Sequence, residues 1–99
     1  MGKVVMKFAI IIEYINDTEK VKTMRPGHRD YLRRFLENGQ LFAAGPFGDE
    51  SGALWILEAE TMEAAETIVQ GDPYALAGIF NSWTIRPFAY WSAKESKGA

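Results

Sequence analysis

The order of short apolar segments along this chain is the feature that most constrains its fold. Runs rich in apolar and β-branched residues, bounded by turn-forming residues, predict strands, whereas apolar residues spaced three and four apart predict helices. The predicted strands are residues 5–14, 41–44, 53–59 and 82–91, and the predicted helices are residues 26–38, 62–70 and a short segment over 74–80. The chain therefore alternates as strand, helix, hairpin, helix and strand.

Local signals set the starts of the predicted helices. Pro26 is expected to open the first helix, because proline is well tolerated in a first turn. Thr61 is expected to cap the second helix, and Asp72 followed by Pro73 is expected to open the short third one. On the first helix, Arg29 and Arg33 are assigned to the solvent side.

This order of elements is that of a ferredoxin-like, split-βαβ domain of the α+β class. Such a domain has a four-stranded antiparallel sheet with its helices on one face. We expect it to span residues 5–91, with residues 92–99 forming a polar tail that has nothing to bury.

The predicted strands carry apolar side chains toward both faces of the sheet. In the third strand Ala53, Trp55 and Leu57 alternate with Leu54 and Ile56, and in the last strand Trp83, Ile85 and Trp91 alternate with Phe88 and Tyr90. An uncovered face of this kind exceeds what a monomer in water normally exposes. We therefore expect a homodimer through the sheet faces, a dimeric α+β barrel, which a charged residue at Trp83 or Trp91 would break.

Composition and charge exclude several classes of function. The 99 residues include no cysteine, which excludes disulfides, thiolate nucleophiles and iron–sulfur or zinc–thiolate sites. The formal net charge is -2 and the basic residues are scattered, so nucleic acid is not an expected partner. No apolar run approaches the ~20 residues of a membrane-spanning helix, and there is no signal-peptide pattern, so we expect no membrane association and a cytoplasmic location.

His28 is the one histidine, so sites that need several imidazoles are excluded. It lies on the apolar stripe of the first predicted helix, in its first turn, where the positive end of the helix dipole favours the neutral imidazole of a general base. The competing interpretation is a packing histidine that bonds a backbone carbonyl.

Asp72 is the leading candidate partner for His28, because it lies at a tight junction between two predicted helices. Capping alone would also select an aspartate before a proline. Gly45 and Pro46 suit either a turn or a close approach of backbone to a ligand. Arg25 is a candidate for binding a substrate carboxylate, and Arg86 is a second one.

Motifs in four places together resemble the YciI-like (YCII-related) family. They are Met24-Arg25-Pro26-Gly27-His28, Ala43-Ala44-Gly45-Pro46, Gly71-Asp72-Pro73-Tyr74 and Arg86-Pro87-Phe88. The resemblance runs over residues 6–90 and keeps the order and spacing of the motifs.

The resemblance implies a dimeric α+β barrel with a pocket where a histidine and an aspartate meet, here His28 and Asp72. In the family this pair is proposed as a general acid/base dyad, and a few relatives dehydrochlorinate a chlorinated hydroxyquinone or carry out muconolactone-type isomerisation. Proton transfer by such a pair needs no metal or cofactor. Five further residues are candidate substrate-binding positions in such a pocket. These are Arg25, Gly45, Pro46, Pro73 and Tyr74.

Three functions are compatible with these residues. The first is a cofactor-free enzyme in which His28 and Asp72 eliminate or isomerise a small cyclic or aromatic substrate. The alternative is a non-catalytic module that binds a small metabolite in the same pocket. The third, a haem protein with His28 as axial ligand, is disfavoured by the acidic partner. A pocket filled by Phe47 and Phe80 would instead indicate a structural role.

Overall fold

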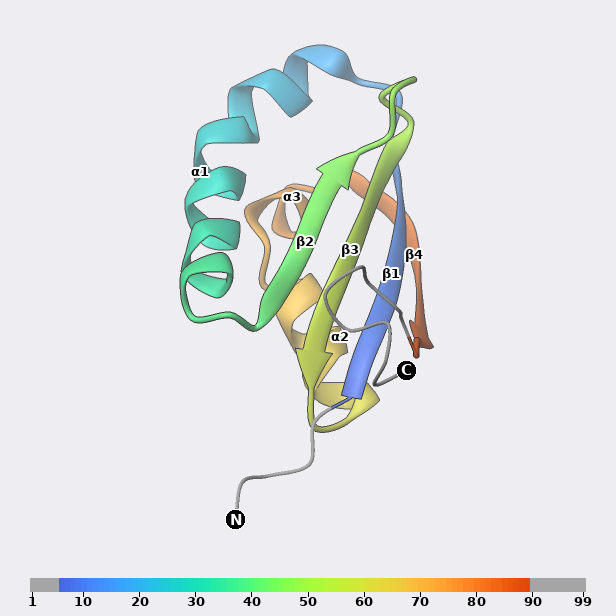
Figure 1. Ribbon diagram of the computed structural model, residues 1–99. Coiled ribbons are helices and arrows are strands. Elements are labelled where there is room, and N and C mark those ends of the chain that lie inside the picture. The colour runs from blue at the N-terminus through green and yellow to red at the C-terminus, as the bar shows by residue number, and fades with distance from the viewer. Residues whose placement is uncertain (1–5, 90–99) are drawn as a thin grey trace.

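The computed structural model describes residues 6–89, which form one four-stranded antiparallel sheet with helices on one face (Figure 1). The elements in chain order are β1 (Met6–Tyr14), α1 (Thr18–Glu37), β2 (Leu41–Pro46), β3 (Gly52–Ala59), α2 (Met62–Gln70), α3 (Pro73–Leu76) and β4 (Phe80–Pro87). The strand order is β2-β3-β1-β4. The predicted α+β, ferredoxin-like fold is confirmed.

The core lies between the sheet and the helices, and the alternation of the strands fills it. Ile10 of β1 pairs with Trp55 of β3 on one side and with Ile85 of β4 on the other. Ile10 and Trp55 are buried, as are Ala53 and Leu57 in the same strand. The predicted division of β3 between a buried and an open face is therefore confirmed.

Among residues 6–89, no helix covers the other face of the sheet, and its apolar side chains keep contact with solvent. Ile11 and Leu54 are directly paired across β1 and β3 on this face and are 42% and 39% exposed. Arg86 of β4 pairs with Ala9 of β1 and lies on the same open face.

The predicted role of Trp83 in a dimer interface is wrong. Trp83 pairs with the buried Ile12, which places it on the helix-covered face, and its indole N–H donates to Glu66 of α2 (3.0 Å). The strand β4 also starts earlier than predicted, at Phe80. Alternation shows that residues share a face but does not show which face the helices cover. Tyr90 and Trp91 lie outside the described residues.

The first helix begins two turns earlier than predicted. It starts at Thr18, and the Asp17 carboxylate caps it by accepting a hydrogen bond from the Lys20 backbone N–H (3.1 Å). Pro26 lies inside the helix, where it lacks the N–H that would bond the Lys22 carbonyl. His28 is consequently in the middle of a 20-residue helix, so the expectation that the helix dipole acts on it is wrong.

The third helix is shorter than predicted. It ends at Leu76, because Gly78 adopts a positive φ of 78° and the Ile79 N–H turns back to the Tyr74 carbonyl (2.8 Å). The chain then enters β4. Across the described residues, no helix is both long enough and apolar enough to cross a membrane.

Candidate active site

His28 and Asp72 meet between α1 and α3. His28 Nδ1 lies 2.7 Å from Asp72 Oδ2 and 3.0 Å from Oδ1, and the aspartate is fully buried. The Tyr74 backbone N–H also donates to Asp72 Oδ1 (2.8 Å). A carboxylate only accepts hydrogen bonds, so Nδ1 is the donor and carries the ring proton. The Asp72 carboxylate therefore both caps α3 and binds His28.

The glycine before Asp72 allows the close approach that this contact needs. A Cβ on Gly71 would lie 2.6 Å from the Tyr31 hydroxyl, which itself donates to the Ile68 carbonyl (2.6 Å). A Cβ on Gly27 would touch the Pro73 ring at 3.7 Å. Gly71 therefore lets the chain pass beside α1 and turn Asp72 toward His28.

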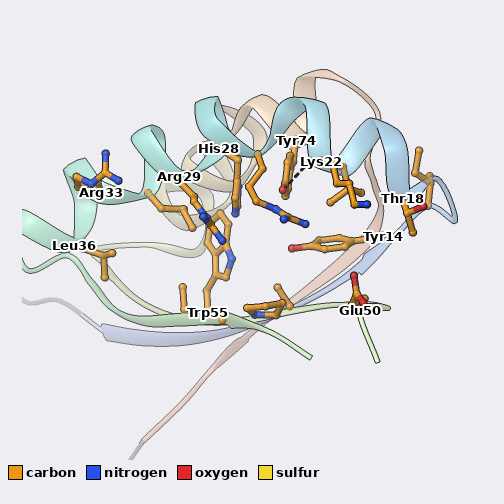
Figure 2. Close-up of a pocket in the computed structure, with 18 of the residues that line it drawn as sticks. Tyr14, Thr18, Lys22, His28, Arg29, Arg33, Leu36, Glu50, Trp55 and Tyr74 are labelled. Carbon is orange, nitrogen blue, oxygen red and sulfur yellow. Dashed lines mark hydrogen bonds between the residues drawn. The ribbon is translucent and has the colours of Figure 1, made fainter. Parts of the chain in front are cut away.

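The Tyr74 ring fixes the plane of the imidazole. The two rings stack with their centroids 3.8 Å apart and their planes at 3°. The Tyr74 hydroxyl donates to the Val21 carbonyl of α1 (3.3 Å), which holds the tyrosine in place. With Nδ1 bound by Asp72, His28 presents Nε2 to the cavity, and Figure 2 shows its ring pointing from α1 into that space.

The cavity in front of His28 has a volume of about 520 Å³ and opens to solvent between α1 and the β2–β3 hairpin. Its walls include Tyr14, Trp55 and Tyr74. Neither Phe47 nor Phe80 lines it: Phe80 is buried in the core and Phe47 is part of the hairpin loop. The pocket is therefore not filled by these two phenylalanines, as a purely structural role would require.

Most of the predicted substrate-binding residues line this cavity. Arg25, Gly45, Pro46 and Tyr74 are in its wall. Pro73 is not, and lies against Gly27 at the contact between α3 and α1. Arg86 is on the open face of the sheet, away from the cavity.

Sequence reasoning missed several lining residues. Lys22, Arg29 and Arg33 face the cavity from α1, although the two arginines were assigned to the solvent side. The signal that could have found them is the spacing of Lys22, Arg25 and Arg29, which places them on one side of a helix that starts at Thr18. Tyr14 and Trp55 were read only as strand residues.

Tyr14 supplies a neutral hydroxyl to the cavity. Burial, with smaller contributions from Tyr74 and Asp72, raises the pKa of Tyr14 to about 12, while Arg25 opposes the rise. Figure 2 shows the hydroxyl directed into the cavity. The group therefore stays protonated at neutral pH and can donate a hydrogen bond to an oxygen of a bound molecule. Within residues 6–89, no group of three or more His, Cys, Asp or Glu side chains is placed to hold a metal ion.

Comparison with known proteins gives one family. Residues 6–89 match the sequence profile of the YCII-related domain. Protein YciI of Escherichia coli O6:H1 is 31% identical over 80 residues, which are 71% of this chain and 82% of that protein, and YciI of Shigella flexneri matches equally well. The uncharacterised YjpA of Bacillus subtilis is 35% identical over 52 residues, covering 52% of this chain and 61% of YjpA.

A solved structure with a similar fold binds a small quinone. It is the 5-chloro-2-hydroxyhydroquinone dehydrochlorinase of Burkholderia phenoliruptrix AC1100 in complex with 2,5-dihydroxybenzoquinone. The superposition has a TM-score of 0.76 at 21% sequence identity and covers 87% of this chain and 96% of the other.

Proposed function

This chain belongs to the YCII-related family, and we propose that it is a cofactor-free enzyme in which His28 and Asp72 act as a general acid/base pair. The reaction class is elimination or isomerisation of a small cyclic or aromatic substrate. The observation that carries the proposal is the short contact of His28 Nδ1 with buried Asp72 (2.7 Å), which leaves Nε2 at the wall of an open cavity.

The proposed chemistry needs one proton acceptor. In an elimination, Nε2 takes a proton from a carbon or hydroxyl of the substrate. The electron pair of that bond forms a new double bond, and the leaving group departs with its own pair. In an isomerisation, the same proton is returned to another carbon of the conjugated system. Asp72 stabilises the imidazolium that forms in either case.

The cavity walls suit a small oxygenated ring. Trp55 and Tyr74 offer flat apolar surface, and Tyr14 offers a neutral donor for a substrate oxygen. Arg25, Gly45 and Pro46 complete the proposed substrate contacts. The similar fold of a dehydrochlorinase that binds 2,5-dihydroxybenzoquinone agrees with this substrate class.

The test is proton transfer that depends on His28. We expect the protein to release chloride from 5-chloro-2-hydroxyhydroquinone or to accelerate exchange of the ring hydrogens of 2,5-dihydroxybenzoquinone with D₂O, followed by NMR. His28→Gln should slow the reaction by at least about 100-fold, the usual size of general-base catalysis. Circular dichroism would confirm that the variant is folded. Equal rates in the two proteins would refute the proposal, and binding of the quinone without any acceleration would favour the binding-module alternative.

We also propose that two copies pair through their open sheet faces. Ile11 and Leu54 lie side by side on this face and remain partly exposed in the single chain. Ile11→Lys should convert the dimer into monomer, because it would bury a charge in the interface. Leu76→Lys is the matched control, since Leu76 is 76% exposed on α3. Sedimentation velocity measures the result, and an Ile11→Lys protein that sediments like the control would contradict the interface.

A further inference from the structure

The cavity has two chemically different walls. The inner wall, close to His28, is formed by the aromatic rings of Tyr14, Trp55 and Tyr74. The outer wall is formed by α1, which directs Lys22, Arg25 and Arg29 into the same space. Figure 2 shows Lys22 and Arg29 on the helix side and Trp55 on the sheet side.

The cations of the outer wall have no acidic partner among residues 6–89. In the part of the chain that the structure describes, no carboxylate lies within ion-pair distance of Lys22, Arg25 or Arg29. Arg33 differs, because it pairs with Asp30 at 2.7 Å. Among the described residues that line the cavity, Glu50 is the acidic one. A chain with a formal net charge of -2 thus concentrates unpaired positive charge at one cavity.

Arg25 is the cation that reaches deepest. It is half-buried, whereas Lys22 and Arg29 are exposed. Its charge also opposes the rise in the pKa of Tyr14, so the guanidinium lies near the Tyr14 hydroxyl. Its guanidinium therefore lies beside Tyr14 of the aromatic wall, while part of the side chain stays exposed.

We propose that the substrate is an organic acid whose carboxylate is bound by Arg25 at the outer wall while its flat apolar body lies against Trp55 near His28. This inference rests on the proposed function and names its substrate class. A guanidinium binds a carboxylate through two parallel hydrogen bonds, which fixes the direction of the acid as well as holding it. Lys22 and Arg29 at the rim attract the anion from solvent. The body of the molecule then points inward, toward the imidazole.

The experiment compares two probes that differ in charge, 2,5-dihydroxybenzoate and 2,5-dihydroxybenzamide, by isothermal titration calorimetry. The acid should bind at least about tenfold more tightly, because a hydrogen bond to a charged group is worth that much. Arg25→Gln should weaken binding of the acid by about 10- to 100-fold and leave the amide unchanged. Arg34→Gln is the control, since Arg34 is on the same helix but lies over the Tyr31 ring, outside the cavity.

Equal affinities for acid and amide, or an acid affinity that Arg25→Gln leaves unchanged, would overturn the inference. This binding experiment and the proton-transfer test of the proposed function can fail independently of each other. Charge-dependent binding that persists while His28-dependent proton transfer is absent would refute the proposed reaction and support the acid site. Proton transfer that depends on His28, together with equal binding of acid and amide, would support the proposed reaction and refute the acid site.

Discussion

Replacing Asp72 with asparagine is expected to move the ring proton of His28 from Nδ1 to Nε2 and to lower the proposed proton-transfer rate by about 10³- to 10⁴-fold. In the native protein the carboxylate accepts from Nδ1 at 2.7 Å and from the Tyr74 N–H at 2.8 Å. In Asp72→Asn, the amide oxygen keeps the bond to Tyr74. The amide NH₂ then faces His28 and can only donate, so Nδ1 must accept and Nε2 must carry the proton. The atom that faces the cavity is no longer a base.

This substitution separates catalysis from stability. Asparagine caps helices as well as aspartate does, so α3 should keep its start. Alanine would instead remove the cap, at a cost of about 1 kcal/mol, and would leave Nδ1 without a partner. Comparable melting temperatures of the wild-type and Asp72→Asn proteins would show that a lower rate has no structural cause.

The tautomer can be observed directly. Because His28 is the one histidine of the chain, the imidazole ¹⁵N chemical shifts in a long-range ¹H–¹⁵N spectrum are assigned without ambiguity. The quinone exchange assay gives the rate in parallel. If both proteins show the same tautomer and the same rate, Asp72 is a helix cap and no more.

Gly52→Ala is expected to lower the free energy of unfolding by at least about 3 kcal/mol, a large share of the roughly 5–15 kcal/mol that stabilises a domain. A Cβ at this position would lie 1.8 Å from the carbonyl oxygen of Ile12 and 2.9 Å from its carbonyl carbon. These are backbone atoms of the central strand β1, which cannot turn aside as the end of a side chain can. The β1–β3 ladder would have to separate locally.

Gly48→Ala provides the matched control, because a Cβ there meets no atom within 4 Å and Gly48 lies in the same hairpin. Urea unfolding followed by tryptophan fluorescence gives the difference in free energy. Coincident transitions for Gly48→Ala and Gly52→Ala would mean that the strands of the native protein are further apart than described.

The sequence predicted the elements whose signals are local. The alternation of Ala53, Trp55 and Leu57 identified β3 and the residues that share one of its faces, and the caps Thr61 and Asp72 are where they were expected. The start of α1 was missed because Pro26 was read as an opening signal. The Asp17 cap and the packing of residues on both sides of the proline outweigh the single hydrogen bond that it removes.

The candidate site was only partly predictable. The contact of His28 with Asp72 joins residues 44 positions apart, so no local pattern contains it and the family motifs were needed to suggest it. The cationic side of α1 was not predicted, because the predicted helix began at Pro26 and Lys22 therefore lay outside it. Which face of β4 the helices cover depends on packing between distant segments, and this is why Trp83 was assigned wrongly.

The binding of His28 Nδ1 by Asp72 limits the stereochemistry of the proposed isomerisation. One atom, Nε2, would face a bound ring, and it would do so from one wall of the cavity. A proton that it removes from one carbon and returns to another therefore stays on the same side of the ring, so the shift is suprafacial.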